Sequence, residues 1–223
     1  MRVLVTGFEP FGGSGVNPSG EIAKALDGRD VGGVRIIGRV LPVRWGVAIQ
    51  TAVDLIDEVR PDAVIMFGQA GGRAAMAVER IGINVCEGTD NAGQAGDGRA
   101  IAPDGPDGVF SRLPVRDIVA AMRAAGVPAE ISNSAGTYLC NHVAYGVPKA
   151  LAAAGSQVPA GFIHVPMLPE QLVALEEAGG RAAAGRSCLP LDWMLRAAEA
   201  AVTATGRALA HEPAPVPSFS HPA

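Results

Sequence analysis

The sequence has few of the features that mark secreted, metal-binding or disulfide-rich proteins. It contains only 3 cysteines in 223 residues, and aromatic residues make up only 4%. Cys86, Cys140 and Cys188 are widely spaced and form no CxxC pair, which argues against a structural zinc site and against a disulfide scaffold. We therefore expect a cytoplasmic protein, kept in a reducing compartment, with no bound metal.

Charge is also scarce, at 18% of residues with a net charge of −4. Lys and Arg form no basic stripe, so there is no electrostatic support for binding nucleic acid or a membrane surface. The first apolar run, residues 3–5, is too short for a signal peptide or a membrane span, and we expect a β-strand there. What remains is a globular protein, 48% hydrophobic and long enough for one substantial core.

Short apolar runs alternate along the chain with segments of helical spacing. The runs predict strands at residues 3–5, 34–40, 63–67, 81–85, 129–132 and 161–165, and the spacing predicts helices at 19–26, 47–60, 116–125, 141–154 and 191–210. Ser19 is a candidate cap for the first helix. This alternation predicts an α/β fold with a mixed or mostly parallel sheet.

The remaining segments predict how the chain is divided. We expect one domain over residues 1–210 and a flexible tail over residues 211–223, where four prolines prevent a helix. The stretch 87–106 is rich in Gly, Asp and Asn and is expected to be a long loop, and loops of that length are often functional.

Cys140 is the first candidate for chemistry. It follows a predicted strand and a turn of small residues, and it lies where a helix is predicted to begin. Free N–H groups and the positive end of the helix dipole would lower the pKa of a thiol there and could bind an oxyanion. The alternative is a small buried core residue, because free cysteine is among the most buried residue types.

A thiol nucleophile needs a base, and a third group should orient that base. His164 ends a predicted strand and points toward the usual ligand crevice of an α/β sheet, although a core histidine is the alternative. His142 is the weaker partner, since positions i and i+2 of a helix do not share a face. Glu79 is the best-placed orienting group, and a solvated Glu paired with a nearby Arg is its alternative.

The loop after the first strand holds two of the six phenylalanines, Phe8 and Phe11. Exposed aromatic side chains there suggest the apolar wall of a pocket, with ordinary core packing as the alternative. The loop is also rich in glycine, but it lacks both the GxGxxG spacing and a following Gly-Lys-Ser/Thr, which argues against a phosphate cradle.

Four motifs in order carry a resemblance to a known family. They are TGFEPFGG (residues 6–13) with NPS (17–19), GQAGGR (68–73) with ER (79–80), AGTYLCNH (135–142), and GFIHVP (161–166) with PEQ (169–171). From residue 3 to about residue 171 the chain closely resembles the bacterial pyroglutamyl peptidase I, or pyrrolidone-carboxylate peptidase, family of thiol proteases.

The resemblance implies an omega-peptidase, a hydrolase that removes the N-terminal pyroglutamyl residue of a peptide substrate. It implies a three-layer α/β/α sandwich, a cytoplasmic homotetramer or other homo-oligomer, and a catalytic triad of Cys140, His164 and Glu79. It also implies that the substrate pocket is formed by Phe8, Phe11, Gln69, Tyr138 and Leu139.

Two positions depart from the pattern of the family. Relatives usually carry an Arg-Ile-Pro-Asp-Asn-Glu-Gly loop, whereas residues 86–93 read CEGTDNAG, without the Arg and the Pro and about two residues shorter. Tyr138 stands where Phe is usual and adds a hydroxyl to the pocket rim.

Cysteine chemistry of this kind would form a thioester and needs neither a metal nor a cofactor. Two other functions are compatible with the residues: a binding module or relative that has lost activity, and another cysteine-dependent amidase. Activity on amides that lack the lactam ring would identify the second of these.

Overall fold

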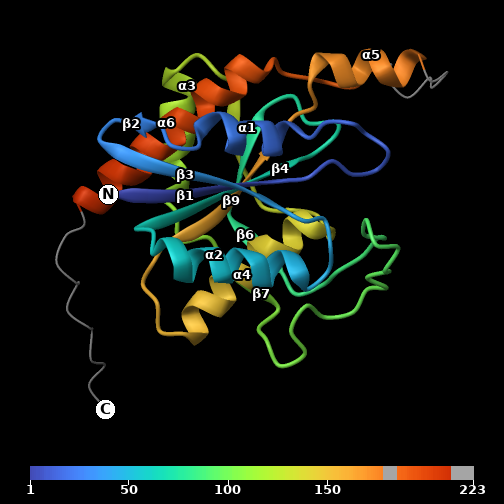
Figure 1. The fold of residues 1–223 in the computed structure, drawn as a ribbon, viewed down its shortest axis with the longest axis horizontal. Coiled ribbons are helices and arrows are strands. Elements are labelled where there is room, and N and C mark those ends of the chain that lie inside the picture. Colours follow the sequence, from blue (N-terminus) through green and yellow to red (C-terminus); the bar gives the residue numbers. More distant parts are fainter. Residues whose placement is uncertain (178–184, 212–223) are drawn as a thin grey trace.

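A central sheet of seven strands organises the computed structural model, which describes residues 1–177 and 185–211 (Figure 1). Its strands are β1 (Arg2–Phe8), β2 (Asp30–Val31), β3 (Val34–Leu41), β4 (Ala63–Gln69), β5 (Met76–Glu79), β8 (Ala129–Ser132) and β9 (Ala160–Val165). Their order is β2-β3-β1-β4-β9-β5-β8. Four neighbouring pairs are parallel, and β2–β3 and β5–β9 are antiparallel. The expected mixed, mostly parallel α/β sheet is thereby confirmed.

Helices cover both faces of this sheet (Figure 1). One face packs against α1 (Pro18–Leu26), α3 (Val115–Ala124) and α6 (Leu191–Ala210), and the other against α2 (Val47–Val59) and α4 (Leu139–Ala153). A further helix, α5 (Pro169–Glu177), follows β9. None of the helices in the described part of the chain is long and apolar enough to cross a membrane.

The middle strands are buried because their side chains point alternately into two apolar cores. In β1, Val3 and Val5 join the core beneath α1 and α6, whereas Leu4 faces α2 and α4. Every residue of β9 is buried, as expected for a strand with a neighbour on each side. The prediction of fully buried strands is therefore confirmed for β9 and nearly so for β1 and β4, whereas β3 and β8 are only partly buried.

The strand predicted over residues 81–85 is shorter than expected and does not belong to the central sheet. The segment contributes only β6 (Ile81–Ile83), which pairs with β7 (Gly108–Phe110) in a separate two-stranded sheet. β6 runs closely over α4, since a Cβ on Gly82 would lie 2.5 Å from the backbone nitrogen of Tyr145. The strand of the main sheet in this region is β5, which was not predicted, and Glu79 is its last residue.

Several boundaries also differ from the predicted ones. Helix α1 is capped by Asn17 and not by Ser19: the Asn17 side chain accepts a hydrogen bond from the Ser19 backbone N–H, at 3.1 Å. The Ser19 hydroxyl instead accepts the Phe8 N–H. Phe8 is the last residue of β1 and is 3% exposed, so only Phe11 lies in the loop where both were expected.

Residues 87–106 form the expected irregular stretch between β6 and β7, braced by isolated bridges such as Cys86–Arg99 and Thr89–Ala95. The predicted tail begins at His211, where α6 is capped, and its residues 212–223 lie outside the described residues.

Candidate active site

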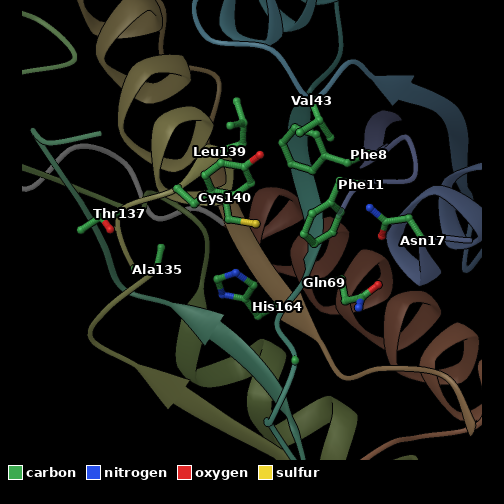
Figure 2. A pocket seen from close by; sticks show the side chains of 13 residues that line it. Phe8, Phe11, Asn17, Val43, Gln69, Ala135, Thr137, Leu139, Cys140 and His164 are labelled. Atoms are coloured by element: carbon green, nitrogen blue, oxygen red, sulfur yellow. The ribbon is translucent and has the colours of Figure 1, made fainter. Parts of the chain in front are cut away.

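A pocket of about 250 Å³ lies where the ends of β1, β4 and β9 meet the start of α4. Figure 2 shows the side chains of Cys140, His164 and Phe11 converging on this pocket. Its lining residues are Phe8, Phe11, Asn17, Val43, Gln69, Gly71, Ala135, Gly136, Thr137, Tyr138, Leu139, Cys140 and His164. The pocket therefore collects seven of the eight residues that the sequence assigned to a site, and Glu79 lies behind it.

His164 and Glu79 meet across the antiparallel pair β9–β5. In this register His164 is opposite Ala77, so Glu79, two residues further, lies diagonally on the same face. The Glu79 Oε1 atom is 2.7 Å from the His164 Nδ1 atom. Both side chains are buried, Glu79 to 1% exposure and His164 to 4%. A hydrogen bond at Nδ1 leaves Nε2 free to act as a base toward the pocket.

Cys140 sits in the first turn of α4, and its side chain lies beside that of His164 in the pocket (Figure 2). Gly68 makes room for the thiol, since a Cβ there would lie 2.7 Å from the Cys140 Sγ atom, and Gly68 is the register partner of His164. Asn141 fixes the turn: its side chain accepts the Ile83 N–H and donates to the Ile83 and Val85 carbonyls. No local pattern in the sequence indicates this anchoring role.

The expected lowering of the thiol pKa is not found. Burial is the main cause, and with the Glu79 carboxylate it raises the pKa of Cys140 to about 12, although Arg73 opposes this. Burial also shifts the pKa of His164, in this case downward, although Glu79 raises it. A neutral thiol beside a neutral imidazole is therefore the resting form at neutral pH, which suits proton transfer during attack rather than a preformed thiolate.

The first turn of α4 can also bind an oxyanion. Tyr138 occupies the N-cap position but, among the described residues, no side chain caps the helix there. The first N–H groups of a helix have no partner within the helix, so those around Cys140 are available to a substrate oxygen.

The predicted pocket residues come from three segments. Phe8 and Phe11 form one wall, and Tyr138 and Leu139 form another beside the thiol. Gln69 ends β4, and its side chain points away from Cys140 and His164 (Figure 2). Gln69 can therefore meet a ligand in the pocket through its backbone.

Gln171 connects the segments that carry this pocket, and sequence reasoning quoted it in a motif without giving it a role. Its Nε2 atom lies within 3.2 Å of the Ser14 hydroxyl, the Val16 carbonyl and the Gln69 Oε1 atom. Its own oxygen accepts the Leu168 N–H at 2.9 Å. One buried amide therefore ties the loop of Phe11 to the ends of β4 and β9.

The Tyr138 hydroxyl contacts the loop of residues 86–93. It donates to the Thr89 carbonyl at 2.7 Å, and the ring packs edge-on against Trp45, with centroids 5.4 Å apart. The same loop is held by Asp90, which is buried and accepts the N–H groups of Trp45, Ala92 and Gln94. This loop therefore holds the Tyr138 side chain in its place beside the pocket.

The other histidines of the described chain lie outside the site. His142 is buried, accepts the Gly46 N–H at Nε2 and packs edge-on against Trp45. His211 contacts the Arg207 carbonyl at the end of α6, and His221 lies outside the described residues. Over residues 1–177 and 185–211, no group of three or more His, Cys, Asp or Glu side chains is arranged to hold a metal ion.

Comparisons with known sequences agree on one family. A family model described as pyroglutamyl peptidase matches residues 1–208. Curated pyrrolidone-carboxylate peptidases of Yersinia pestis (strain Pestoides F) and Yersinia pseudotuberculosis (serotype O:1b) are each 47% identical to the chain over 174 residues. The match spans 77% of this chain and 81% of each relative.

Solved structures give the same result. The pyrrolidone carboxyl peptidase of Pyrococcus furiosus is similar with a TM-score of 0.88 and 40% identity, over 94% of this chain and 100% of that chain. Pyroglutamyl peptidase I of Bacillus amyloliquefaciens is similar with a TM-score of 0.86 and 34% identity, over 95% of this chain and 98% of that one.

Proposed function

The chain belongs to the pyroglutamyl peptidase family, hydrolases that remove N-terminal pyroglutamate, and on that premise we propose that Cys140, His164 and Glu79 are its catalytic triad. The observation that carries this proposal is the 2.7 Å contact between Glu79 and His164 Nδ1 beside a pocket that His164 shares with the Cys140 thiol. The three residues then act as nucleophile, base and orienting group.

In the first half of the reaction, the Cys140 Sγ atom attacks the carbonyl carbon of the pyroglutamyl residue, and its proton passes to His164 Nε2. The carbonyl oxygen becomes an oxyanion, which the N–H groups around Cys140 stabilise. When the carbon–nitrogen bond breaks, His164 gives that proton to the leaving amine. The product of this half is a thioester between the pyroglutamyl group and Cys140.

In the second half, a water molecule takes the place of the amine. His164 Nε2 removes its proton as the water oxygen attacks the thioester carbon, and the Sγ atom leaves and recovers the proton. Glu79 keeps Nδ1 protonated throughout, so that Nε2 can accept and donate in turn. Pyroglutamic acid is released, and the resting thiol and imidazole are restored.

Specificity follows from the chemistry of the pocket. The pyroglutamyl ring is a small neutral lactam, and we propose that Phe8 and Phe11 enclose it while the Gln69 backbone bonds its N–H and C=O. Tyr138 and Leu139 line the side nearest the thiol. A peptide with a free N-terminal ammonium would have to give up the hydration of its charge in this apolar space, which strongly disfavours it.

Release of a chromophoric amine from a pyroglutamyl anilide tests the proposal, with the Cys140→Ala variant as the control. We expect thiol-dependent release by the wild-type protein and none by the variant. Equal release by both would reject Cys140 as the nucleophile. If folded, reduced wild-type protein released nothing from the anilide but bound pyroglutamate, a binding module would replace the enzyme.

We also propose that residues 1–210 act as one domain and that the enzyme works in the cytoplasm as a homo-oligomer, a tetramer or dimer. The site draws on segments from Phe8 to Gln171, which supports a single functional unit. Cys86, Cys140 and Cys188 are free thiols, which is compatible with a reducing compartment. Light scattering on the purified chain would measure the oligomeric state.

A further inference from the structure

Arg73 makes contacts that the catalytic steps leave unexplained. It follows Gly71 and Gly72 in the connection between β4 and β5, and the backbone of Gly72 has a φ of +98°, a conformation that favours glycine. This turn sends the chain back, and the Arg73 guanidinium reaches Glu79, behind His164. Its side chain is partly buried, at 26% exposure.

One nitrogen of Arg73 contacts three acceptors on two segments of the chain. Its Nη2 atom is 3.1 Å from the Glu79 Oε1 atom, 3.2 Å from the Ser132 hydroxyl and 3.0 Å from the Ser134 carbonyl. The Glu79 oxygen is the same atom that contacts His164. Ser134 begins the turn that leads through residues 135–137 to the nucleophile. Arg73 therefore bonds both to the group that orients the base and to the segment that positions the thiol.

Glu79 depends on this contact because it has few other partners. Its Oε2 atom is buried and has no hydrogen-bond partner among the described residues. A buried carboxylate is costly unless it is paired. In the described structure, Arg73 is the cation that pairs with it besides a protonated His164.

We propose that Arg73 is a positioning residue for the hydrolysis reaction, holding the Glu79 side chain oriented toward His164 while it fixes the turn that carries Cys140. This role rests on the proposed triad. Arg73 does not line the pocket, so its contribution belongs to the chemical step and not to the binding of the pyroglutamyl ring.

The role predicts a shift in pH dependence. The titratable and charged groups around Glu79 are His164 on β9, Cys140 on α4 and Arg73 itself, and Glu130 on β8 lies 3.5 Å from Arg73. Burial lowers the pKa of His164, and the Arg73 cation contributes in the same direction. Without that cation the pKa of His164 rises, so the base is protonated at a higher pH and activity is lost earlier on acidification.

The experiment compares pH profiles of kcat/KM on a pyroglutamyl anilide for wild-type, Arg73→Gln and Arg73→Lys proteins. For Arg73→Gln we expect a kcat at least about tenfold lower, a KM within about twofold of wild type, and an acid limb displaced to higher pH. Arg73→Lys keeps the cation but replaces the planar guanidinium with a compact ammonium on a different stem, so its acid limb should stay in place while the altered hydrogen-bond geometry lowers kcat severalfold.

Arg80→Gln is the matched control. Arg80 is also partly buried and lies one residue after Glu79, but its guanidinium bonds to Asn133 at 2.8 Å, away from the pocket. Its profile should overlay that of wild type. Thermal unfolding of all variants separates a loss of folded protein from a loss of turnover.

Three results would overturn the role. If the acid limb of Arg73→Gln coincides with that of wild type, Arg73 contributes only to the structure of the protein. If the variant raises KM and leaves kcat unchanged, Arg73 acts in substrate binding. If Arg73→Gln does not fold, the Arg73→Lys variant tests the role instead. A wild-type kcat or an acid limb at higher pH in that variant would contradict it. Failure of the wild-type enzyme to cleave the anilide would instead count against the proposed function.

Discussion

The pocket side and the catalytic side of the site are held in place in different ways. On the pocket side, Phe8 and Phe11 offer apolar surface, and the polar Gln69 side chain is turned away and bound to Gln171. On the catalytic side, Glu79 and His164 are buried, and charged or polar atoms meet at 2.7 to 3.2 Å.

The difference predicts unequal sensitivity to mutation. An apolar wall loses affinity roughly in proportion to the surface removed, because its contacts are many and individually weak. A buried hydrogen-bonded chain of charges fails as a unit, because one missing member leaves the others unpaired or wrongly protonated. Substitutions on the catalytic side should therefore lower kcat by orders of magnitude, and those on the pocket side should raise KM modestly.

The largest effect is expected for Cys140→Ser. A hydroxyl at this position is a much weaker nucleophile toward His164 as base, so kcat should fall at least about 10³-fold, with an unfolding temperature close to that of wild type. Steady-state rates and thermal melts measure both. Cys188→Ser changes a half-buried thiol outside the pocket and should retain full activity. A near-normal kcat in Cys140→Ser would contradict the expectation that the catalytic side is the more sensitive one.

The next effect is expected for Glu79→Gln. An amide can present its NH₂ group to His164 Nδ1, which would place the imidazole proton on Nε2 and disable the base. We expect kcat to fall about 10²- to 10⁴-fold with little change in KM, measured under saturating anilide. An equal rise in KM would mean that Glu79 also shapes the pocket.

A smaller effect is expected for Phe11→Ala on the pocket side. Phe11 is partly exposed and lines the pocket, so its loss removes apolar contact with the ring at a cost of about 1 to 2 kcal/mol. KM should rise about tenfold while kcat changes little. Phe110→Ala, at a residue on β7 that is 63% exposed and outside the pocket, should leave KM unchanged. A dominant loss of kcat in Phe11→Ala would contradict the proposed division.

The smallest effect is expected for Tyr138→Phe. The change removes only the bond to the Thr89 carbonyl, and a hydrogen bond of this kind contributes about 1 kcal/mol. KM should rise about threefold because the wall beside the thiol is less firmly supported. In Tyr145→Phe the lost bond, to the Pro106 carbonyl, lies away from the pocket, so stability but not KM should change.

Much of the fold was predictable because its pattern is local. Helix α6 was predicted with its observed bounds from amphipathic spacing, and β4 and β9 from continuous apolar runs. Strand β5 was missed because it is only four residues long, Met-Ala-Val-Glu, and lies between the paired strands β8 and β9. Its strand conformation comes from those neighbours, which lie more than forty residues further along the chain.

The site shows the same limit. Residue type and motif were enough to select Cys140, His164 and Glu79. Arg73 and Gln171 also belong to the sequence motifs of the family. Their contacts, however, join residues up to 157 positions apart, which no local pattern reveals. The thiol pKa was expected to fall because a helix start can be read from sequence, whereas the burial that raises it cannot.

The position of β9 in the sheet couples catalytic activity to the last step of sheet formation. β9 comes late in the chain yet separates β4 from β5, so the two groups of strands, β2-β3-β1-β4 and β5-β8, join only when it inserts. The same event brings His164 to Glu79. Pairings between distant segments form slowly, because the chain must first close large loops. Recovery of turnover during refolding should therefore track completion of the sheet, and a ribosome-bound chain that ends before residue 160 has no working site.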